Sequence, residues 1–352
     1  MHIVVDYASK GGVSKVALKQ ALLLQAILVV LSKYRPWLEL LSNIKHKYSR
    51  QLKLPILNRT VNILLSPLLG FGLLRNAKLV LAHQMSCCLY VMTQGVKYVA
   101  YIHDLHYSPI PITRFTKPLI QSLEIRALEK AELILTNSIN TSQALKRLYG
   151  LNSIVIHPGV DVPPSIPWKR PRRILMVSRL SELKTMLPLA TGLAKKLNCE
   201  VVIAGAWSRS IIGIKMPRNV RLIVDPEEHE LTKLYMTSRV LVHMKPENFA
   251  LPPLEAMACG TPPIVAKGCG VCQLFEHKIH GYKVKDWATL NDIIDTVEKI
   301  LEDEWLKMGK NARKHVIEQD LTWEKHVKTL SNILKQHDLI RDNLFLGHIF
   351  KI

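Results

Sequence analysis

The sequence predicts two α/β domains in tandem, each with a doubly wound parallel sheet covered by helices on both faces. Three observations lead there. The chain has 352 residues, more than one hydrophobic core usually organises. Short β-branched runs that are apolar on both faces alternate with helical patterns, as in buried parallel sheets. The alternation then restarts after the proline-rich stretch "PGVDVPPSIPWKRPRR", which we take as the domain linker.

In the first domain the strand-like runs come at regular intervals. They are "HIVVDY" at the start, "LVLAH" at 79–83, "YVAYIH" at 98–103, "LILTNS" at 133–138 and "SIVIHP" at 153–158. Between the first two we expect a helix over 13–31. Its apolar run "ALLLQAILVVL" at 21–31 is too short to span a bilayer and is expected to be buried. No basic leader precedes an apolar core, so we expect no signal peptide.

In the second domain the expected strands are "ILMVS", "VVIAG", "VRLIV", "RVLVHM" and "PPIVA", with helices between them. Near the C-terminus Trp323, Val327, Leu330 and Leu334 form an apolar stripe on one helix face. We assign 1–165 to the first domain, 166–335 to the second and 336–352 to a tail that packs back towards the first. Ligands of such sheets bind beyond the carboxyl ends of the strands, so the site is expected in a cleft between the domains.

The composition limits the classes of partner that the protein is expected to bind. Lys and Arg outnumber Asp and Glu by 48 to 28, a net charge of +20, which favours a polyanionic partner such as phosphorylated ligands, an anionic membrane or nucleic acid. Aromatic residues make up only 6% and no nucleic-acid-binding motif occurs, which argues against nucleic acid. The six cysteines have no framework spacing and suit a reducing compartment. The lone "CGVC" at 269–272 has no second pair to complete a zinc site, so we interpret it as structural, with metal or redox use as the alternative.

Two loops that follow strands carry features suited to phosphate. Gly11 and Gly12 open a helix, where backbone N–H groups can face an anion, although an ordinary tight turn explains them as well. Arg179 and Lys184 share the loop after "ILMVS". Arginine binds phosphate as a fork and lysine as a point charge. The pair suits a diphosphate, and solvated surface charges are the alternative.

A third loop, "KPENFAL", joins the strand "RVLVHM" to a helix that begins "PPLEAMA". Glu247 lies in the loop, and we expect Glu255 in the first turn of the helix. A carboxylate accepts two hydrogen bonds side by side and therefore suits the vicinal hydroxyls of a ribose or hexose. The alternative is that Glu255 only complements the helix dipole.

With its two glutamates eight positions apart, "ENFALPPLEAMACGTPPIVA" resembles the signature of retaining glycosyltransferase family 4, whose members have the GT-B fold of two Rossmann-like domains. Further motifs occur in the family's order along nearly the whole chain. They are "GG" at 11–12, "VLAH", "HD" at 103–104, "AELILTNS", "VIHPGVD", Arg179 with Lys184, "AG" at 204–205 and "LTWE" at 321–324.

The resemblance implies a role for each matching residue. Arg179 and Lys184 would hold the diphosphate of a nucleotide sugar, Glu255 the ribose and Glu247 the donor sugar. His103 would face the reacting sugar, and the glycine loop at 11–12 would approach the donor phosphate. The backbone amides around sugar and phosphate would come from Asn248, Phe249, Ala250 and Leu251.

The sequence also departs from the family pattern. Asn248 and Ala250 stand where glycine is usual, Thr185 follows Lys184 where glycine is common, and Gln273 replaces a carboxylate. These changes leave the donor-side charges in place. They affect the shape of the loop and the identity of the donor.

No Asp-x-Asp occurs in the chain, so we expect metal-independent transfer in which Arg179, Lys184 and helix N-termini stabilise the departing diphosphate. No cofactor is expected besides the donor substrate. No carboxylate is a convincing covalent nucleophile, which suits the family's front-face route, and Glu247 as nucleophile is the minor alternative.

The expected partners are a UDP- or GDP-linked hexose and a lipid-linked or oligosaccharide acceptor. Residues 33–59 carry seven basic residues against one acid, Glu39, interleaved with aromatic residues and leucines. This pattern suits peripheral association of a cytoplasmic protein with the anionic inner face of the cell membrane, and a solvated face is the alternative. The competing functions are a sugar-nucleotide epimerase of the same fold and an inactive sugar-nucleotide-binding relative.

Overall fold

A computed structural model describes residues 1–5, 11–31, 42–48, 70–105 and 117–340. The chain forms two compact units. Unit 1 comprises Met1–Pro158 together with Trp323–Ile352, and unit 2 comprises Gly159–Thr322. The basic segment 33–59 lies outside the described residues except for its part at 42–48, and so does the tail from residue 341 onwards.

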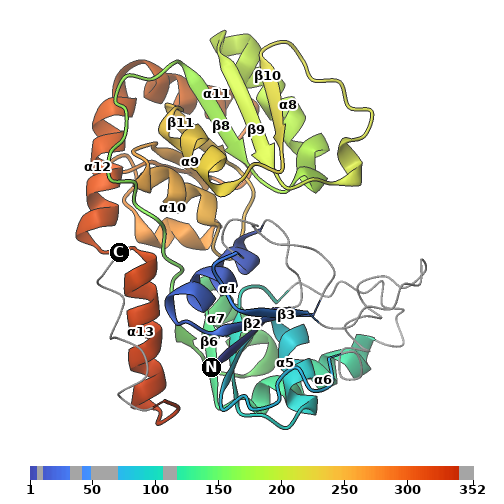
Figure 1. The fold of residues 1–352 in the computed structure, drawn as a ribbon. Helices are drawn as coiled ribbons and strands as arrows, with labels where there is room; N and C mark the ends of the chain where they lie inside the picture. Colours follow the sequence, from blue (N-terminus) through green and yellow to red (C-terminus); the bar gives the residue numbers. More distant parts are fainter. Residues whose placement is uncertain (6–10, 32–41, 49–69, 106–116, 341–352) are drawn as a thin grey trace. The chain divides into compact units, whose positions relative to one another are not determined.

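Unit 1 has a parallel sheet of seven strands in the order β3-β2-β1-β4-β5-β6-β7 (Figure 1). Its strands are β1 (His2–Val5), β2 (Ile27–Val30), β3 (His46–Tyr48), β4 (Val80–His83), β5 (Tyr98–Ile102), β6 (Leu133–Thr136) and β7 (Ile154–Val155). Its helices are α1 (Gly12–Leu23), α5 (Met85–Thr93), α6 (Lys117–Glu129), α7 (Ile139–Tyr149) and α13 (Trp323–Gln336). Helix α5 packs against α6, and α1 packs against α13.

The expected helix over 13–31 is wrong in its second half. Helix α1 ends at Leu23, Gln25 takes a positive φ of 50°, and the chain then enters β2. The sequence "ILVV" is apolar enough for either element, but its β-branched residues suit a strand that is buried between two neighbours. The apolar run at 21–31 is thus the end of one helix and a buried strand. Among the described residues, no helix is both long and apolar enough to cross a bilayer.

Unit 2 has a parallel sheet of six strands in the order β10-β9-β8-β11-β12-β13. Its strands are β8 (Arg173–Val177), β9 (Glu200–Gly205), β10 (Val220–Val224), β11 (Val240–His243), β12 (Pro263–Ala266) and β13 (Tyr282–Val284). Its helices are η1 (Leu180–Glu182), α8 (Leu183–Leu197), η2 (Arg209–Ile211), α9 (Glu228–Met236), α10 (Leu251–Ala258), η3 (Gly270–Leu274), α11 (Leu290–Lys299), η4 (Ile300–Glu304) and α12 (Trp305–Glu318).

Helices cover both faces of the unit 2 sheet, where α8 packs against α11 and α10 packs against both α9 and α12. The fold class is therefore as predicted: two α/β units, each with a doubly wound parallel sheet. The strands expected from β-branched runs all form, whereas β2, β3 and β13 were not anticipated.

The C-terminal stripe is buried as expected, with Trp323, Val327, Leu330 and Leu334 each at most 2% exposed. Their helix, α13, belongs to unit 1 and packs against α1. The predicted boundaries at 165/166 and 335/336 thus differ from the compact units, which divide at 158/159 and 322/323. Next to these divisions, the N–H of Val160 donates to the carbonyl of Leu321 at 3.0 Å.

Arg170, in the proline-rich stretch, is the most thoroughly bonded cation described. Its side chain is buried, and its guanidinium donates to the carbonyls of Pro167 (2.8 Å), Ser238 (2.9 Å) and Cys259 (2.7 Å) and to the hydroxyl of Thr261 (2.6 Å). Burial lowers the pKa of Arg170 to about 10, which leaves the group charged at neutral pH. The ends of α9 and α10 are thereby joined to the start of unit 2.

Replacing Arg170 should destabilise unit 2 strongly. Arg170→Ala removes the guanidinium that donates to the buried Ser238 and Cys259 carbonyls and to the Thr261 hydroxyl, so we expect a loss of about 3 kcal/mol in the free energy of unfolding, measured in urea. The matched control is Arg172→Ala, because Arg172 pairs with Glu302 at the surface with 41% of its side chain exposed and should cost less than about 1 kcal/mol. Equal losses from the two variants would contradict the role given to Arg170.

Candidate donor site

Each sheet has one point at which the strand order reverses, and ligands of open α/β sheets bind at the carboxyl ends beside such a point. In unit 2 the reversal lies between β8 and β11, and in unit 1 between β1 and β4. The predicted site residues follow these strands or the neighbouring β5.

The loop after β8 carries two exposed cations around one acid. Arg179 lies just before η1, Lys184 lies in the first turn of α8, and Glu182 lies between them. Within the described residues, neither the Arg179 nor the Lys184 side chain makes a hydrogen bond or ion pair. The loop starts close to β9, because a Cβ on Gly205 would lie 1.8 Å from the carbonyl oxygen of Ser178. Glycine is therefore required at the end of β9.

Lys245, which belongs to no motif of the sequence, connects the two strands of the reversal. It follows β11 and forms an ion pair with Glu182 of the β8 loop. Its Nζ also lies 3.8 Å from a carboxylate oxygen of Glu247. Glu182 and Glu247 are 27% and 32% exposed. The loops after β8 and β11 are thus joined through one ammonium group, and Glu247 is held beside the loop of Arg179 and Lys184.

His243, the last residue of β11, gives a second connection. Its side chain is 4% exposed, and it hydrogen-bonds to the backbone of Val177 at the end of β8. Burial lowers the pKa of His243, while Glu247 opposes that shift. Its Nε2 has no hydrogen-bond partner in the described part of the chain. A neutral imidazole therefore lies between the ends of β8 and β11, next to the charged loops.

The loop 247–250 is held by its backbone. The N–H of Gly270 donates to the carbonyl of Glu247 at 3.0 Å, and the N–H of Val271 donates to that of Phe249 at 2.8 Å. Phe249, Ala250 and Leu251 are buried, whereas Asn248 is half-buried. Two carbonyls of the loop are thus occupied by η3, the segment that contains "CGVC".

Ala250 has a backbone conformation suited to glycine. It precedes α10 with φ 68° and ψ 101°, a region that is unfavourable for a residue with a Cβ. The family-like pattern has glycine here, so the chain retains the backbone geometry without the residue that adopts it most easily. Asn248, the other departure, is not among the residues with positive φ.

Glu255 lies in the second turn of α10 rather than in the first, because the helix begins at Leu251. The hydroxyl of Tyr235 donates to a carboxylate oxygen of Glu255 at 2.7 Å. Burial raises the pKa of Tyr235 well above its usual range, so the phenol stays a donor. The position weakens the helix-dipole alternative, since that interaction is confined to the first turn.

The cysteines of "CGVC" are buried donors within unit 2. The Cys269 thiol contacts the carbonyl of Lys245 at 2.9 Å, and the Cys272 thiol that of Ala266 at 3.4 Å. Burial raises the pKa of Cys269 to about 12 and that of Cys272 to about 11. Both stay protonated at neutral pH, so their contacts agree with the structural interpretation.

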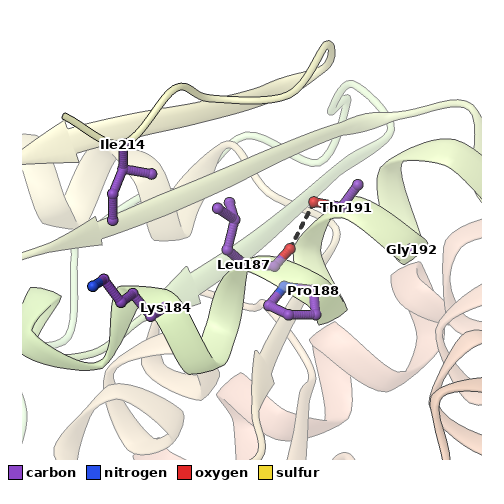
Figure 2. Close-up of a pocket in the computed structure, with 6 residues that line it drawn as sticks. All are labelled: Lys184, Leu187, Pro188, Thr191, Gly192 and Ile214. Carbon is purple, nitrogen blue, oxygen red and sulfur yellow. Dashed lines mark hydrogen bonds between the residues drawn. The ribbon is translucent and has the colours of Figure 1, made fainter.

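An open hollow of about 580 Å³ lies beside α8. Figure 2 shows the residues that line it, with Lys184 at one end. It is lined mostly by apolar groups, from Leu187, Pro188, Thr191, Gly192 and Ile214. The Thr191 hydroxyl donates to the carbonyl of Leu187 at 2.7 Å. Apart from Lys184, the hollow offers a diphosphate no cation and contains no other predicted site residue.

In unit 1, Gly11 and Gly12 open α1, with Gly11 extended at φ −142°. His103 follows β5 and is 5% exposed. Its Nε2 lies 2.9 Å from Nδ1 of His83 at the end of β4, and its carbonyl accepts from the amide of Asn137 at 3.2 Å. His103 is thus fixed at both its ring and its backbone. Because Gly11, Gly12 and His103 belong to unit 1, their part in a donor site stays a prediction.

Two family models match adjoining parts of the chain. The one described as "Glycosyl transferases group 1" matches residues 163–318, and "Glycosyltransferase Family 4" matches 38–163. Together they cover about four fifths of the chain. This chain belongs to the group 1, family 4 type of glycosyltransferases. The group 1 match includes Arg179, Lys184 and the whole segment 247–255, and the Family 4 match includes His103.

Individual relatives of this glycosyltransferase-family chain are distant. The D-inositol 3-phosphate glycosyltransferase of Mycolicibacterium smegmatis is 26% identical over 242 residues, which cover 60% of this chain and 55% of that protein. The match thus spans about half of the relative's length.

Solved structures establish the fold as GT-B. Sucrose-phosphate synthase from Thermosynechococcus elongatus matches with a TM-score of 0.78 at 16% identity, covering 95% of this chain and 98% of that one. Anabaena HepE in complex with UDP-glucose matches with a TM-score of 0.70, also at 16% identity, covering 95% and 99%. At these identities the likeness concerns the fold alone.

Ala250→Gly should be neutral or stabilising. It removes a positive-φ penalty of about 1–2 kcal/mol from the folded state. The greater conformational freedom of glycine also stabilises the unfolded chain, but by a somewhat smaller free energy. We expect a gain of up to about 1 kcal/mol in the free energy of unfolding, measured by denaturant titration. Ala256→Gly is the matched control in the interior of the helix that follows, where glycine should cost about 1 kcal/mol. Equal losses at both positions would show that the backbone at 250 is not strained.

Proposed function

We propose that this chain transfers a hexosyl group from a UDP- or GDP-linked sugar to a lipid-linked or glycan acceptor, with retention of configuration and without a metal ion. The observation that carries the proposal is the arrangement at the β8–β11 reversal. Arg179 and Lys184 have no hydrogen-bond or ion-pair partner among the described residues, and Glu182 lies between them in the sequence. Lys245 forms an ion pair with Glu182 and lies 3.8 Å from a carboxylate oxygen of Glu247. Anabaena HepE, whose fold the chain shares, was solved with UDP-glucose, which supports a nucleotide sugar as donor.

The charges suit the two ends of such a donor. A diphosphate needs strong donors, and Arg179 and Lys184 are exposed and available. Glu247 and Glu255 can each accept from hydroxyls, and we assign the donor sugar to Glu247 and the ribose to Glu255. In Glu255 one carboxylate oxygen accepts from Tyr235, which fixes the orientation of the carboxylate.

The chemistry follows from electrostatics. As the bond between sugar and diphosphate breaks, negative charge builds on the leaving group, and fixed cations lower the energy of that state. Arg179 and Lys184 supply two of them. Lys245 is already paired with Glu182, so we assign it the positioning of Glu247. In the first turn of α10, only Leu251 and Leu254 have a backbone N–H, because Pro252 and Pro253 have none.

The acceptor side is proposed from unit 1. Peripheral binding to an anionic membrane was expected from residues 33–59, of which only part is described. Within that part, Lys45 is exposed and Lys47 donates to the carbonyl of Leu73 at 3.3 Å. Phe71, in the same turn as Leu73, is 85% exposed. An exposed aromatic side chain beside basic residues suits an anionic lipid surface, where a lipid-linked acceptor would be presented.

A sugar-nucleotide epimerase and a binding-only relative remain the competing functions. An epimerase would need no separate acceptor, whereas a transferase releases free nucleoside diphosphate in proportion to the sugar transferred. Product analysis separates the two. A binding-only relative would bind donor and release nothing with any acceptor.

The first test is ligand binding with matched variants. UDP, GDP and their hexose conjugates are screened by thermal shift, since a ligand of the native state raises the melting temperature. For the ligand found, Lys184→Ala should weaken binding about tenfold, the order of one charge-assisted hydrogen bond. Lys195→Ala, an exposed lysine at the other end of the same helix, should leave binding unchanged.

Two outcomes would contradict the site. One is equal binding by wild type and the Lys184→Ala variant, and the other is turnover unchanged in Glu247→Ala. Activity that is abolished by EDTA and restored by a divalent cation would refute metal-independent transfer. An inverted anomeric centre in the product, identified by proton NMR, would refute retention.

The membrane proposal is tested by co-sedimentation with vesicles. Wild-type protein should pellet with phosphatidylglycerol vesicles at low salt and be released at high salt, because exposed charges are screened. The double variant Phe71→Ser with Lys45→Glu should pellet less, whereas Lys195→Glu in unit 2 should behave as wild type. Failure of the wild type to pellet at low salt would end this proposal and leave the donor site unaffected.

A further inference from the structure

A chain of buried hydrogen bonds runs through unit 1 from α13 to His103. His157 Nδ1 lies 3.0 Å from the carbonyl of Asn137, and the carbonyl of His157 lies 2.7 Å from Nδ1 of His326 on α13. From there the chain continues through the amide of Gln20 on α1 and the ring of His83 on β4. We call Gln20, His83 and His326 the relay.

The relay contacts are all short. His326 Nε2 lies 2.8 Å from the amide nitrogen of Gln20, and the amide oxygen of Gln20 lies 2.8 Å from Nε2 of His83. His83 Nδ1 lies 2.9 Å from Nε2 of His103. Gln20 and His83 are fully buried, and His326 is 4% exposed.

The direction of every bond follows from one fixed acceptor. A backbone carbonyl cannot donate, so His326 Nδ1 must carry the proton that faces His157. A neutral His326 then has a lone pair on Nε2, which requires the amide nitrogen of Gln20 to donate to it. The amide oxygen therefore faces His83, whose Nε2 must carry a proton.

The same logic reaches His103. His83 now has its lone pair on Nδ1, so Nε2 of His103 donates to it, and the lone pair of His103 is on Nδ1. That nitrogen makes no hydrogen bond within the described part of the chain. Turning the Gln20 amide over would place the lone pair of His326 Nδ1 against the carbonyl of His157, two acceptors face to face. The orientation is thus determined by the backbone of residue 157.

Neutrality of the rings has independent support. Burial lowers the pKa of His103 to about 3 and that of His326 to about 4, and it holds the pKa of His83 well below its usual range. Ring packing restricts rotation as well. Tyr101 lies 4.6 Å from the ring of His103, 5.4 Å from that of His83 and 6.1 Å from that of His326, between ring centroids.

We propose that Gln20, His83 and His326 are positioning residues that hold His103 as the neutral Nε2–H tautomer, so that its Nδ1 offers a lone pair and not a proton. In the transfer reaction, His103 then accepts a hydrogen bond from a sugar hydroxyl and cannot protonate a leaving group from that nitrogen. The catalytic consequence rests on the proposed function, whereas the tautomer itself does not.

The tautomer is tested on the full-length chain by NMR. Long-range ¹H–¹⁵N correlation of the histidine rings distinguishes Nδ1–H from Nε2–H, and single histidine replacements assign the signals. At pH 7.5 we expect Nε2–H for His103 and His83 and Nδ1–H for His326. An Nδ1–H signal for His103, or a doubly protonated His326, would overturn the proposal whether or not a reaction has been found.

Two variants of Gln20 separate positioning from packing. Gln20→Met has almost the same shape but no hydrogen-bonding group, whereas Gln20→Glu keeps an oxygen that accepts from His83 and can pair with a protonated His326. We expect Gln20→Glu to retain the His103 signature and Gln20→Met to lose it. In the transferase assay, kcat should fall roughly tenfold to a hundredfold in Gln20→Met, with little change in the KM for donor.

The NMR spectra and the transferase assay test the relay and the proposed function independently. If no donor is ever turned over, the proposed function fails while the spectra still judge the relay. If Gln20→Met does not fold, the wild-type and Gln20→Glu spectra decide. If Gln20→Met folds and keeps the wild-type His103 signal, the relay does not set the tautomer and the proposal is wrong.

Discussion

The reversal of strand order in each sheet is the constraint on which the rest of the structure depends. At a reversal, two neighbouring parallel strands send their chains to opposite sides, so the loops beyond their ends are not held by a common helix. Side chains must join those ends. In unit 2 Lys245 and His243 join β11 to β8, and in unit 1 His83 contacts Gln20 and His103. The connecting residues Lys245 and His83 therefore also contact Glu247 and His103, two residues of the proposed site.

The connections between the strand ends differ in charge between the two units. The unit 2 connection is charged and partly exposed, so its ion pairs contribute little to stability, and the exposed cations Arg179 and Lys184 lie in the same loop as Glu182. The unit 1 connection is neutral and buried. An unpaired polar group would be costly there, and every hydrogen bond has a fixed direction. This contrast suits binding of an anionic donor in one unit and orientation of a single imidazole in the other.

Much of the fold could be predicted because apolar periodicity is local. The strands at 80–83, 98–102 and 240–243 follow from β-branched runs, and the buried face of α13 follows from the spacing of Trp323, Val327 and Leu330. The helix over 13–31 was wrong because "ILVV" is equally apolar in a buried helix and a buried strand. The pairing of 27–30 with β1 and β3, and not its apolarity, distinguishes the two.

The sequence by itself determined the two-unit α/β fold, the family and the charges of the proposed donor site, since these depend on residue types at fixed spacings. It had no signal for Lys245 as the connection to Glu247 or for Gln20 as a contact of His83, and it marked Ala250 only as a departure from the glycine of the family pattern. Nor could it place α13 in unit 1. Only the tertiary structure decided these points, because a hydrogen bond between residues 306 positions apart, such as that of Gln20 with His326, exists only once distant elements pack together.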